Sequence, residues 1–190
     1  MRRAIVAFIA LAVCVGCTTV AKQAYYAATG PQGSYLVISS KPGADLEHYK
    51  ALEIVRFSNN IPSAVGQFLV DSVQEHAAQD MLRSRYFEGV TAVPEFVKGK
   101  TEKPTLVLRG TVLDVTSDKV AGQKLLDSNY LLATVDVVDK ATGEILAQAN
   151  VRGVVKSVAE SGDTPLAEGM GRGIKKLFKE LLHKTEKEEQ

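Results

Sequence analysis

Residues 130–151, with the sequence YLLATVDVVDKATGEILAQANV, contain two alternating apolar segments separated by a short polar loop. Apolar side chains at every second position are typical of a strand with one buried face. The loop at residues 139–143 ends in glycine, which favours a tight hairpin between the two strands. We therefore expect a hairpin whose apolar residues form one side of a sheet, namely Leu131, Ala133, Val135, Val137, Ile145, Ala147, Ala149 and Val151.

Four further strands are predicted around this hairpin. The longest covers residues 105–115, where the apolar positions change parity around Gly110. Such a change indicates a β-bulge, and we expect it at this glycine. Shorter strands are expected at residues 35–38, 51–57 and 90–93. Together with the hairpin, they give a sheet of about six strands.

Two helices with an apolar stripe are predicted, one before and one after the long strands. Residues 63–86 repeat apolar side chains at intervals of three and four, which is the period of one helix face. A second helix begins at residues 161–165, and its stripe is expected to pack on the apolar side of the hairpin. The stripes consist of Val65, Phe68, Leu69, Val73, Ala77 and Met81 in the first helix, and of Leu166, Met170, Ile174, Leu177, Phe178 and Leu181 in the second.

These elements predict an α+β fold of two layers. About six strands in a mainly antiparallel or mixed sheet are expected to pack against the two amphipathic helices. We expect a single domain over residues 35–184, followed by a charged tail at residues 185–190. The chain has 190 residues, 45% of them hydrophobic, which suits one globular domain.

Charge and cysteine content exclude some classes of function. The net charge is +1, so the chain lacks the basic footprint of a nucleic-acid-binding protein. Its two cysteines are Cys14 and Cys17, and none follows. The predicted domain therefore has neither a disulfide framework nor a catalytic thiol.

The first residues have the pattern of a signal peptide. Two arginines precede an apolar run at residues 4–15, which is too short for a spanning helix of roughly 20 residues. Gly16-Cys17 follows, and this junction resembles the bacterial lipobox, in which a small residue precedes an acylated cysteine. The resemblance implies that residues 1–16 are removed and that lipid on Cys17 holds the chain to a membrane. Cys14 stands where the lipobox usually has a larger aliphatic residue, so ordinary secretion or an uncleaved anchor is the alternative.

The residues after Cys17 bear on location and tethering. Thr18 stands where a signal for inner-membrane retention would usually be Asp. The resemblance therefore implies the outer membrane of a Gram-negative cell, with the domain facing the periplasm. Residues 17–34 lack periodicity and include Gly30-Pro31 and Gly33, so we expect a lipidated tether without essential packing.

The order of the predicted elements resembles a family of bacterial lipoproteins. The segments YLVISS, ALEIVRFSNN, LVLRGTVLDV and YLLATVDVVDKATGEILAQANVRG, together with the helix at residues 63–86, are similar to the envelope lipoproteins with domain of unknown function 4410. More distantly, the chain looks like the TolB amino-terminal domain, the lipoprotein activators of peptidoglycan synthases and the curli secretion lipoprotein. The resemblance implies binding to another envelope protein, although a fold does not fix a function.

No catalytic or metal constellation stands out in the sequence. The histidines, His48, His76 and His183, have no metal-site spacing, so no metal or cofactor is expected. Asp114, Asp118, Asp136 and Asp139 lie at strand ends and loops, where aspartate is ordinary. The segment GMGRG at residues 169–173 could suggest a phosphate loop, but the helical stripe continues through it. Close packing of a helix on the sheet explains these glycines better.

One basic face is the candidate binding site. Arg172, Lys175, Lys176 and Lys179 recur at helical spacing in the second helix. They form either a solvated face or a docking surface for an acidic partner or an anionic glycan. The preferred hypothesis is a non-catalytic accessory or interaction lipoprotein that binds another envelope component. The alternatives are a subunit of an oligomeric lipoprotein complex for secretion or assembly, and an envelope enzyme whose site converges only in three dimensions.

Overall fold

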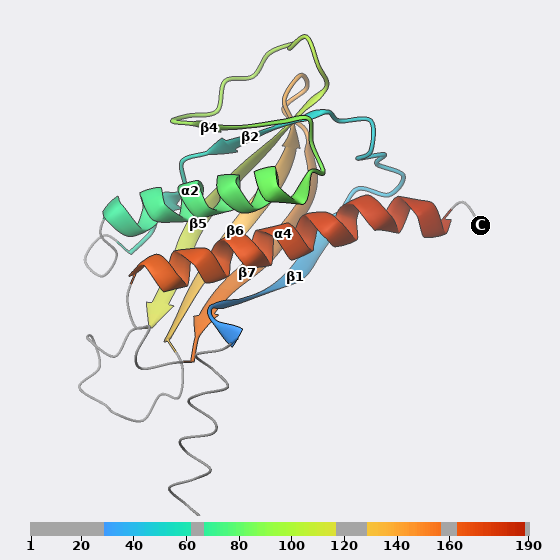
Figure 1. Cartoon of the computed structure of the whole chain (residues 1–190). Helices are drawn as coiled ribbons and strands as arrows, with labels where there is room; N and C mark the ends of the chain where they lie inside the picture. Colours follow the sequence, from blue (N-terminus) through green and yellow to red (C-terminus); the bar gives the residue numbers. More distant parts are fainter. Residues whose placement is uncertain (1–28, 62–66, 117–128, 157–162, 189–190) are drawn as a thin grey trace, which may run out of the picture.

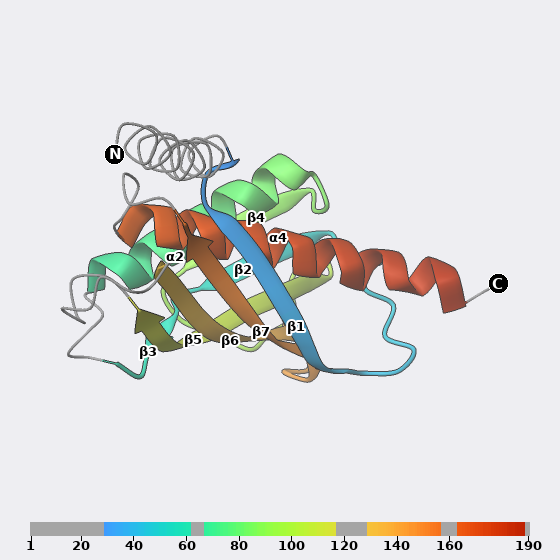
Figure 2. The same ribbon diagram turned by 90° about the horizontal axis from the view of Figure 1, so that it is seen from below.

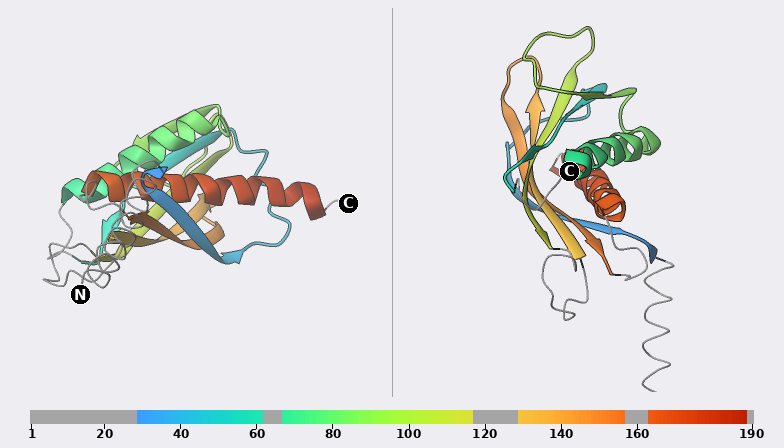
Figure 3. Two further views of the ribbon diagram at one scale, coloured as in Figure 1. Left: turned by 60° about the horizontal axis from the view of Figure 1, so that its bottom comes forward. Right: turned by 90° about the vertical axis from the view of Figure 1, so that its left-hand side faces the viewer.

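In the part of the chain that the structure describes, seven strands form one mixed sheet and two helices pack against it (Figure 1). The computed structural model describes residues 29–61, 67–116, 129–156 and 163–188. Both helices cover the same face of the sheet, as the two views of Figure 3 show. The predicted fold class, a two-layer α+β arrangement of a mixed sheet and two helices, is confirmed.

The predicted strands and helices occur in the expected order along the chain. The strands are β1 (Gln32–Ser40), β2 (Ala51–Val55), β3 (Ser58–Asn59), β4 (Gly89–Val93), β5 (Thr105–Thr116), β6 (Asn129–Asp139) and β7 (Ile145–Val155), and the helices are α2 (Gln67–Ser84) and α4 (Asp163–Glu188). The short strand β3 has no counterpart among the predicted elements. Residues 62–66, where the first helix was expected to begin, lie outside the described residues.

The sheet combines an antiparallel and a parallel half. Its strand order is β1-β7-β6-β5-β2-β4, with β3 also paired to β5. The pairs β1–β7, β7–β6 and β6–β5 are antiparallel, whereas β2 is parallel to both β5 and β4. A parallel pair needs a crossover connection, and α2 provides it between β2 and β4. Among the described residues β1 forms one edge of the sheet, and Figure 2 shows it along the near side.

The bulge in β5 lies three residues beyond its predicted position. The register between β5 and β6 shifts from Val112 to Asp114, so Leu113 is the extra residue and is exposed. At Gly110 the ladder is regular, and the prediction of a bulge there is wrong. This glycine makes room for an aromatic ring, because a Cβ at this position would lie 2.6 Å from Cδ1 of Phe57.

The predicted hairpin joins β6 to β7. In its loop Gly143 has a φ of +76°, a conformation that favours glycine, and its N–H donates to the carbonyl oxygen of Asp139 at 2.8 Å. The expected position of Ile145 on the buried face is wrong. A register shift at the start of β7 buries Leu146 and leaves Ile145 exposed.

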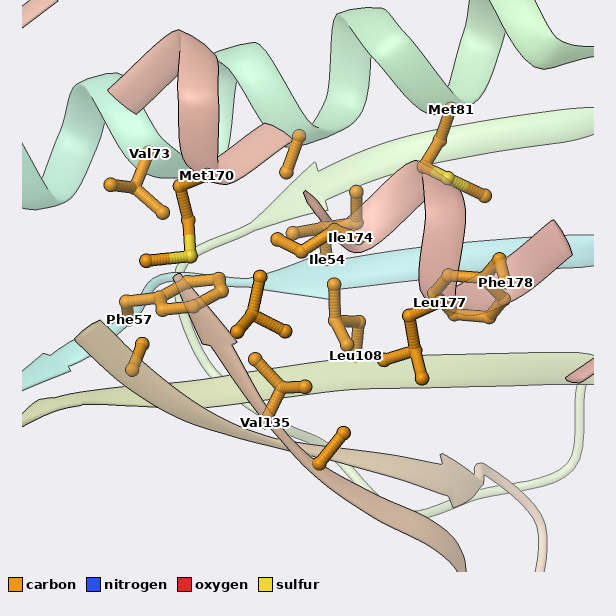
Figure 4. Packing of buried hydrophobic residues seen from close by; sticks show 14 of the residues in the cluster. Ile54, Phe57, Val73, Met81, Leu108, Val135, Met170, Ile174, Leu177 and Phe178 are labelled. Atoms are coloured by element: carbon orange, nitrogen blue, oxygen red, sulfur yellow. The ribbon is translucent and has the colours of Figure 1, made fainter. Parts of the chain in front are cut away.

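The helical stripes and the inner face of the sheet form the main core, part of which appears in Figure 4. Helix α4 contacts β1, β7 and β6, so its predicted packing on the hairpin is confirmed. Phe68 was expected in the stripe of α2, but its side chain is exposed. The buried stripe of α2 instead follows a spacing of four residues, which Phe68 does not share, and includes Leu69, Val73, Ala77 and Met81.

Glycines bring α4 unusually close to its neighbours. A Cβ on Gly173 would lie 2.6 Å from Cγ1 of Val151 in β7, and one on Gly169 would lie 2.8 Å from the carbonyl oxygen of Gln32 in β1. On another side of α4, a Cβ on Gly171 would lie 2.9 Å from the carbonyl oxygen of His76 in α2. The segment GMGRG is therefore an interior part of a helix, and the close-packing interpretation of its glycines is confirmed.

The folded domain begins earlier than predicted. Strand β1 starts at Gln32, and Gly33 is buried against α4, so residues 32–34 belong to the sheet. The expectation of a tether without packing is therefore wrong for residues 32–34. Gly33 was taken as a linker signal, but it is glycine because the strand packs closely on α4. Helix α4 likewise continues to Glu188, into the segment expected as a charged tail. Residues 17–28 and 189–190 lie outside the described residues.

Candidate functional site

The sheet face opposite the helices is the first candidate surface. Its outward residues are mostly polar and are linked across strands by hydrogen bonds, for example from Thr134 Oγ1 to Asn150 Oδ1 at 2.9 Å. One end of this face is covered by the chain after β4, where Phe96 packs near a small apolar cluster of Val55, Val107 and Val138. The sequence did signal this face, because the polar residues Thr134, Asp136, Gln148 and Asn150 alternate with the buried residues of the hairpin.

A cleft of about 570 Å³ lies on this face, and we call it the sheet cleft. Ten of its lining residues come from β2, β5, β6, β7 and the chain around β3. They are Val55, Arg56, Ser58, Asn60, Arg109, Thr111, Leu113, Thr134, Asp136 and Gln148. Most of these side chains can donate or accept hydrogen bonds, so the cleft suits a polar ligand better than an apolar one.

Three side chains form a cross-strand row in the sheet cleft. Arg109, Asp136 and Gln148 lie directly opposite one another on β5, β6 and β7. Arg109 Nε donates to Asp136 Oδ2 at 3.1 Å, and Gln148 Nε2 donates to Asp136 Oδ1 at 2.8 Å. The row is partly buried, which limits the motion of its side chains. A solvated cross-strand ion pair contributes only about 0.2–1 kcal/mol to stability.

A second ion pair lies at the rim of the sheet cleft. Arg56 donates from Nε and Nη2 to the two carboxylate oxygens of Asp71 in α2, at 2.7 and 2.9 Å. Hydrogen bonding from this guanidinium lowers the pKa of the Asp71 carboxyl. Both side chains are nearly half exposed, so the pair fixes the orientation of Arg56 more than it stabilises the fold.

Strand β1 is a second candidate surface. Among the described residues it pairs with β7 alone, so no strand pairs with the backbone along its other edge, although the carbonyl oxygen of Gly33 accepts from Lys176. Leu36 and Ile38 point away from the helices and are 67% and 51% exposed. No charged residue or proline occurs between Gln32 and Ser40. Natural sheet edges are usually protected by such residues, so β1 is open to an added strand.

The predicted basic face does not form one free docking surface. Arg172 donates from Nη1 to the carbonyl oxygens of Thr29 and Pro31 and from Nη2 to Glu168. Lys176 Nζ donates to the carbonyl oxygen of Gly33 at 2.8 Å. These two residues therefore fix the chain that leads into β1. Sequence reasoning placed their charges in solvent because it missed that β1 begins beside α4.

Within the described part of the chain, Lys175 and Lys179 make no comparable contacts with the segment that leads into β1. Lys179 is exposed and Lys175 is partly exposed on α4. Among the described residues neither makes a hydrogen bond or ion pair. Cys17, the predicted lipidation site, lies outside the described residues.

A smaller cavity of about 340 Å³ lies at the opposite end of the sheet from the bulge, next to the hairpin loop. Inside it, the hydroxyl of Tyr49 donates to Asp139 Oδ2 at 2.6 Å. Burial and this hydrogen bond raise the pKa of Tyr49. For Asp139, burial raises the pKa, but hydrogen bonds from Tyr49 and from Thr142 and Ala141 in the loop outweigh it, so the pKa is lowered. The arrangement keeps both groups in fixed protonation states and suits a structural role.

Asp114 and His48, which were assigned no site role from the sequence, each have a local partner. Asp114 accepts from the hydroxyl of Tyr130, and His48 Nδ1 contacts the carbonyl oxygen of Asp45. In the described ranges no three histidine, cysteine, aspartate or glutamate side chains gather as they would around a metal ion. Within the same ranges no helix has both the length and the apolar character needed to cross a membrane.

Comparison with known proteins gives similarities of fold. No family model and no curated protein matches the chain, so the similarity to the family with domain of unknown function 4410 stays a resemblance. Among solved structures, a PelC dodecamer from Paraburkholderia phytofirmans is 18% identical, with 75% of this chain and 94% of that chain covered at a TM-score of 0.47. Protein XCC0632 from Xanthomonas campestris is 13% identical, with 80% and 93% covered at 0.47. Lipoprotein GNA1162 from Neisseria meningitidis is 14% identical, with 73% and 99% covered at 0.39.

Proposed function

We propose that this chain is a non-catalytic lipoprotein of the bacterial cell envelope that binds another envelope protein through strand β1. The anchor is lipid on Cys17, and the residue at position 18 favours the outer membrane with the domain in the periplasm. The observation that carries the binding proposal is the open edge of β1, with Leu36 and Ile38 exposed beside it. The partner contributes an extended segment that continues the sheet.

The physical basis is backbone pairing at a sheet edge. An added strand satisfies the N–H and C=O groups of β1, and its outward side chains cover Leu36 and Ile38. The register of β1 with β7 is regular from Gln32 to Val37 and shifts at Ile38. A partner strand therefore pairs best with the first six residues of β1, which also carry no charge.

Capture of the partner from crosslinked envelopes tests this proposal. The full chain with Leu36→Lys and Ile38→Lys is compared with the full chain carrying Phe68→Lys and Leu82→Lys. The control pair lies on α2 and is similarly exposed, at 66% and 55%. We expect the β1 variant to lose a captured protein that the wild type and the α2 variant both retain. Equal capture by both variants would remove β1 as the binding edge.

The lipid anchor has a separate test. In Cys17→Ser the acyl acceptor is absent, so we expect an uncleaved or soluble chain in place of one found with the membrane. Two or more acyl chains hold a protein firmly because each buried CH₂ contributes about 0.8 kcal/mol. Mass spectrometry of the wild-type amino terminus gives the direct readout. An unmodified Cys17 in the mature protein would refute the lipoprotein proposal.

Self-assembly is the second candidate, and it uses the same edge. Because β1 is uncharged, two copies can pair antiparallel without placing like charges opposite each other. In a two-fold pair centred on Leu36 this residue faces itself, so the full chain with Leu36→Cys forms a disulfide dimer under oxidising conditions. The parent chain, with only Cys14 and Cys17, measures the background. Dimers specific to Leu36→Cys identify a second copy as the partner.

A further inference from the structure

We propose that the sheet cleft binds a neutral saccharide. The proposal concerns a different surface from β1 and does not depend on the lipid anchor. It rests on three properties of the cleft: its balanced charge, its unused hydrogen-bonding groups and the exposed aliphatic side chain of Leu113.

The charges of the sheet cleft are balanced in pairs. Arg109 is paired with Asp136 within the row, and Arg56 is paired with Asp71 at the rim. An anionic ligand would meet the Asp136 carboxylate next to the cation that attracts it, and a cationic ligand would meet Arg109. A neutral polar ligand avoids both repulsions.

The same pairs leave hydrogen-bonding groups unused. Among the described residues the only hydrogen bond of Arg109 is from Nε, so its two Nη groups can still donate. Gln148 uses its Nε2 toward Asp136, and its Oε1 can still accept. The Asn60 side chain, also at the cleft, has no hydrogen bond within the described residues. Donors and acceptors therefore alternate over a short distance.

Vicinal hydroxyl groups match this alternation. Each hydroxyl can accept from Arg109 and donate to an amide or carboxylate oxygen at once, whereas a carboxylate or phosphate only accepts. The partly buried cross-strand row holds its side chains in place before binding, which reduces the entropy that a ligand must overcome. A polyhydroxylated ring therefore uses the cleft more fully than an anion does.

The aliphatic part of the cleft suits the C–H faces of such a ring. Val55 and Leu113 line it beside the polar row. Leu113 is exposed because the β5 bulge turns it outward, and bulges often redirect a side chain next to a functional site. The cleft volume of about 570 Å³ lies within the usual range for small-molecule sites.

Saturation-transfer NMR on the full-length lipoprotein in detergent micelles tests the proposal. The neutral probes are cellotetraose, maltotetraose and tetra-N-acetylchitotetraose, and the anionic comparison is tetragalacturonate. Two variants alter the cleft, Arg109→Gln and Asn60→Ala. Arg152→Gln is the matched control, because Arg152 lies on the same face over the Tyr130 ring and outside the cleft lining.

We expect at least one neutral probe to bind with a Kd below about 10 mM, as suits an exposed polar site. Arg109→Gln should weaken it by roughly tenfold and Asn60→Ala by a few-fold, whereas Arg152→Gln should leave it unchanged. The Asn60 side chain makes no hydrogen bond among the described residues, so its variant keeps the test valid if Arg109→Gln fails to fold. Three outcomes overturn the proposal: no neutral probe binds, the cleft variants bind as the wild type does, or tetragalacturonate binds more tightly than every neutral probe.

Discussion

Replacing Gly33 with alanine tests whether this residue lies in a loose tether or in a strand packed on a helix. A tether tolerates alanine, because a free chain has room for a methyl group. In the structure, however, the new Cβ would lie 2.6 Å from Cα of Gly173 and closer still to the Gly173 nitrogen and the Gly169 carbonyl oxygen. These atoms belong to the backbone of α4 and cannot rotate away. Either β1 or α4 must move.

The expected loss of stability follows from overpacking. An extra methyl group in a tightly packed interior costs about 1–3 kcal/mol, and more where only backbone can yield. We expect about 3 kcal/mol for Gly33→Ala. Since 1 kcal/mol shifts the thermal midpoint by about 2–4 °C in a domain of this size, the midpoint should fall by roughly 6–12 °C.

The assay is thermal and urea unfolding of the full chain, with Gly99→Ala as the matched control. A Cβ on Gly99 would meet no atom within 4 Å, and its φ is not positive. Alanine at such a site changes stability by less than about 1 kcal/mol, often upward, because it restricts the unfolded chain. If Gly33→Ala and Gly99→Ala unfold at the same temperature, β1 does not pack on α4 as described.

Three further predictions concern the core, the acid range and the basic residues. Phe178→Ala should destabilise the domain by about 3–5 kcal/mol in urea unfolding, because this side chain is fully buried. Tyr49→Phe should lower the free energy of unfolding by about 1.5–3 kcal/mol at pH 7, because it removes a hydrogen bond to the Asp139 carboxylate. The lowered pKa of Asp139 means that this contribution is present above about pH 4 and is lost as the pH falls through the folded-state pKa. The destabilisation by Tyr49→Phe should therefore shrink in unfolding curves recorded at pH 3. Reversing the charge of Lys175 and Lys179 together should change stability by no more than about 0.5 kcal/mol in the same assay, because neither makes a hydrogen bond or ion pair among the described residues.

Local patterns in the sequence were sufficient for most of the fold. Alternation located the hairpin and β5, and spacing of three and four located both helices, because each pattern reports which side chains are buried. The patterns did not reveal the parallel pairing of β2 with β4 and β5, which depends on how α2 crosses the sheet. They also misplaced the bulge. An extra residue at Gly110 or at Leu113 would change the alternation of apolar residues along β5 in the same way, so the sequence alone does not distinguish the two positions.

The candidate surfaces were harder to predict than the fold. Arg109, Asp136 and Gln148 come from three strands, and only the register places them in one row. The sequence showed each as an ordinary polar position on a solvated face. The open edge of β1 was equally hard to predict. Alternating apolar residues predict a strand, but they do not show whether one or two other strands pair with it. Arg172 and Lys176 were taken for surface charges because their acceptors are backbone carbonyls, which a sequence does not display.

The packing of β1 on α4 also affects how readily the edge of β1 can bind a partner strand. Gly33 holds one face of the strand against the helix, while Arg172 and Lys176 fix the chain around its start. An edge held in this way needs little further ordering when another strand adds to it, and pre-organisation of this kind favours binding. Gly33→Ala should therefore reduce both stability and partner capture. Leu36→Lys with Ile38→Lys, which alters only exposed side chains, should reduce capture while leaving the unfolding midpoint nearly unchanged. If the lysine variant lost partner capture and also unfolded at a lower temperature, Leu36 and Ile38 would support the fold. The proposal that these two side chains act only in binding would then be wrong.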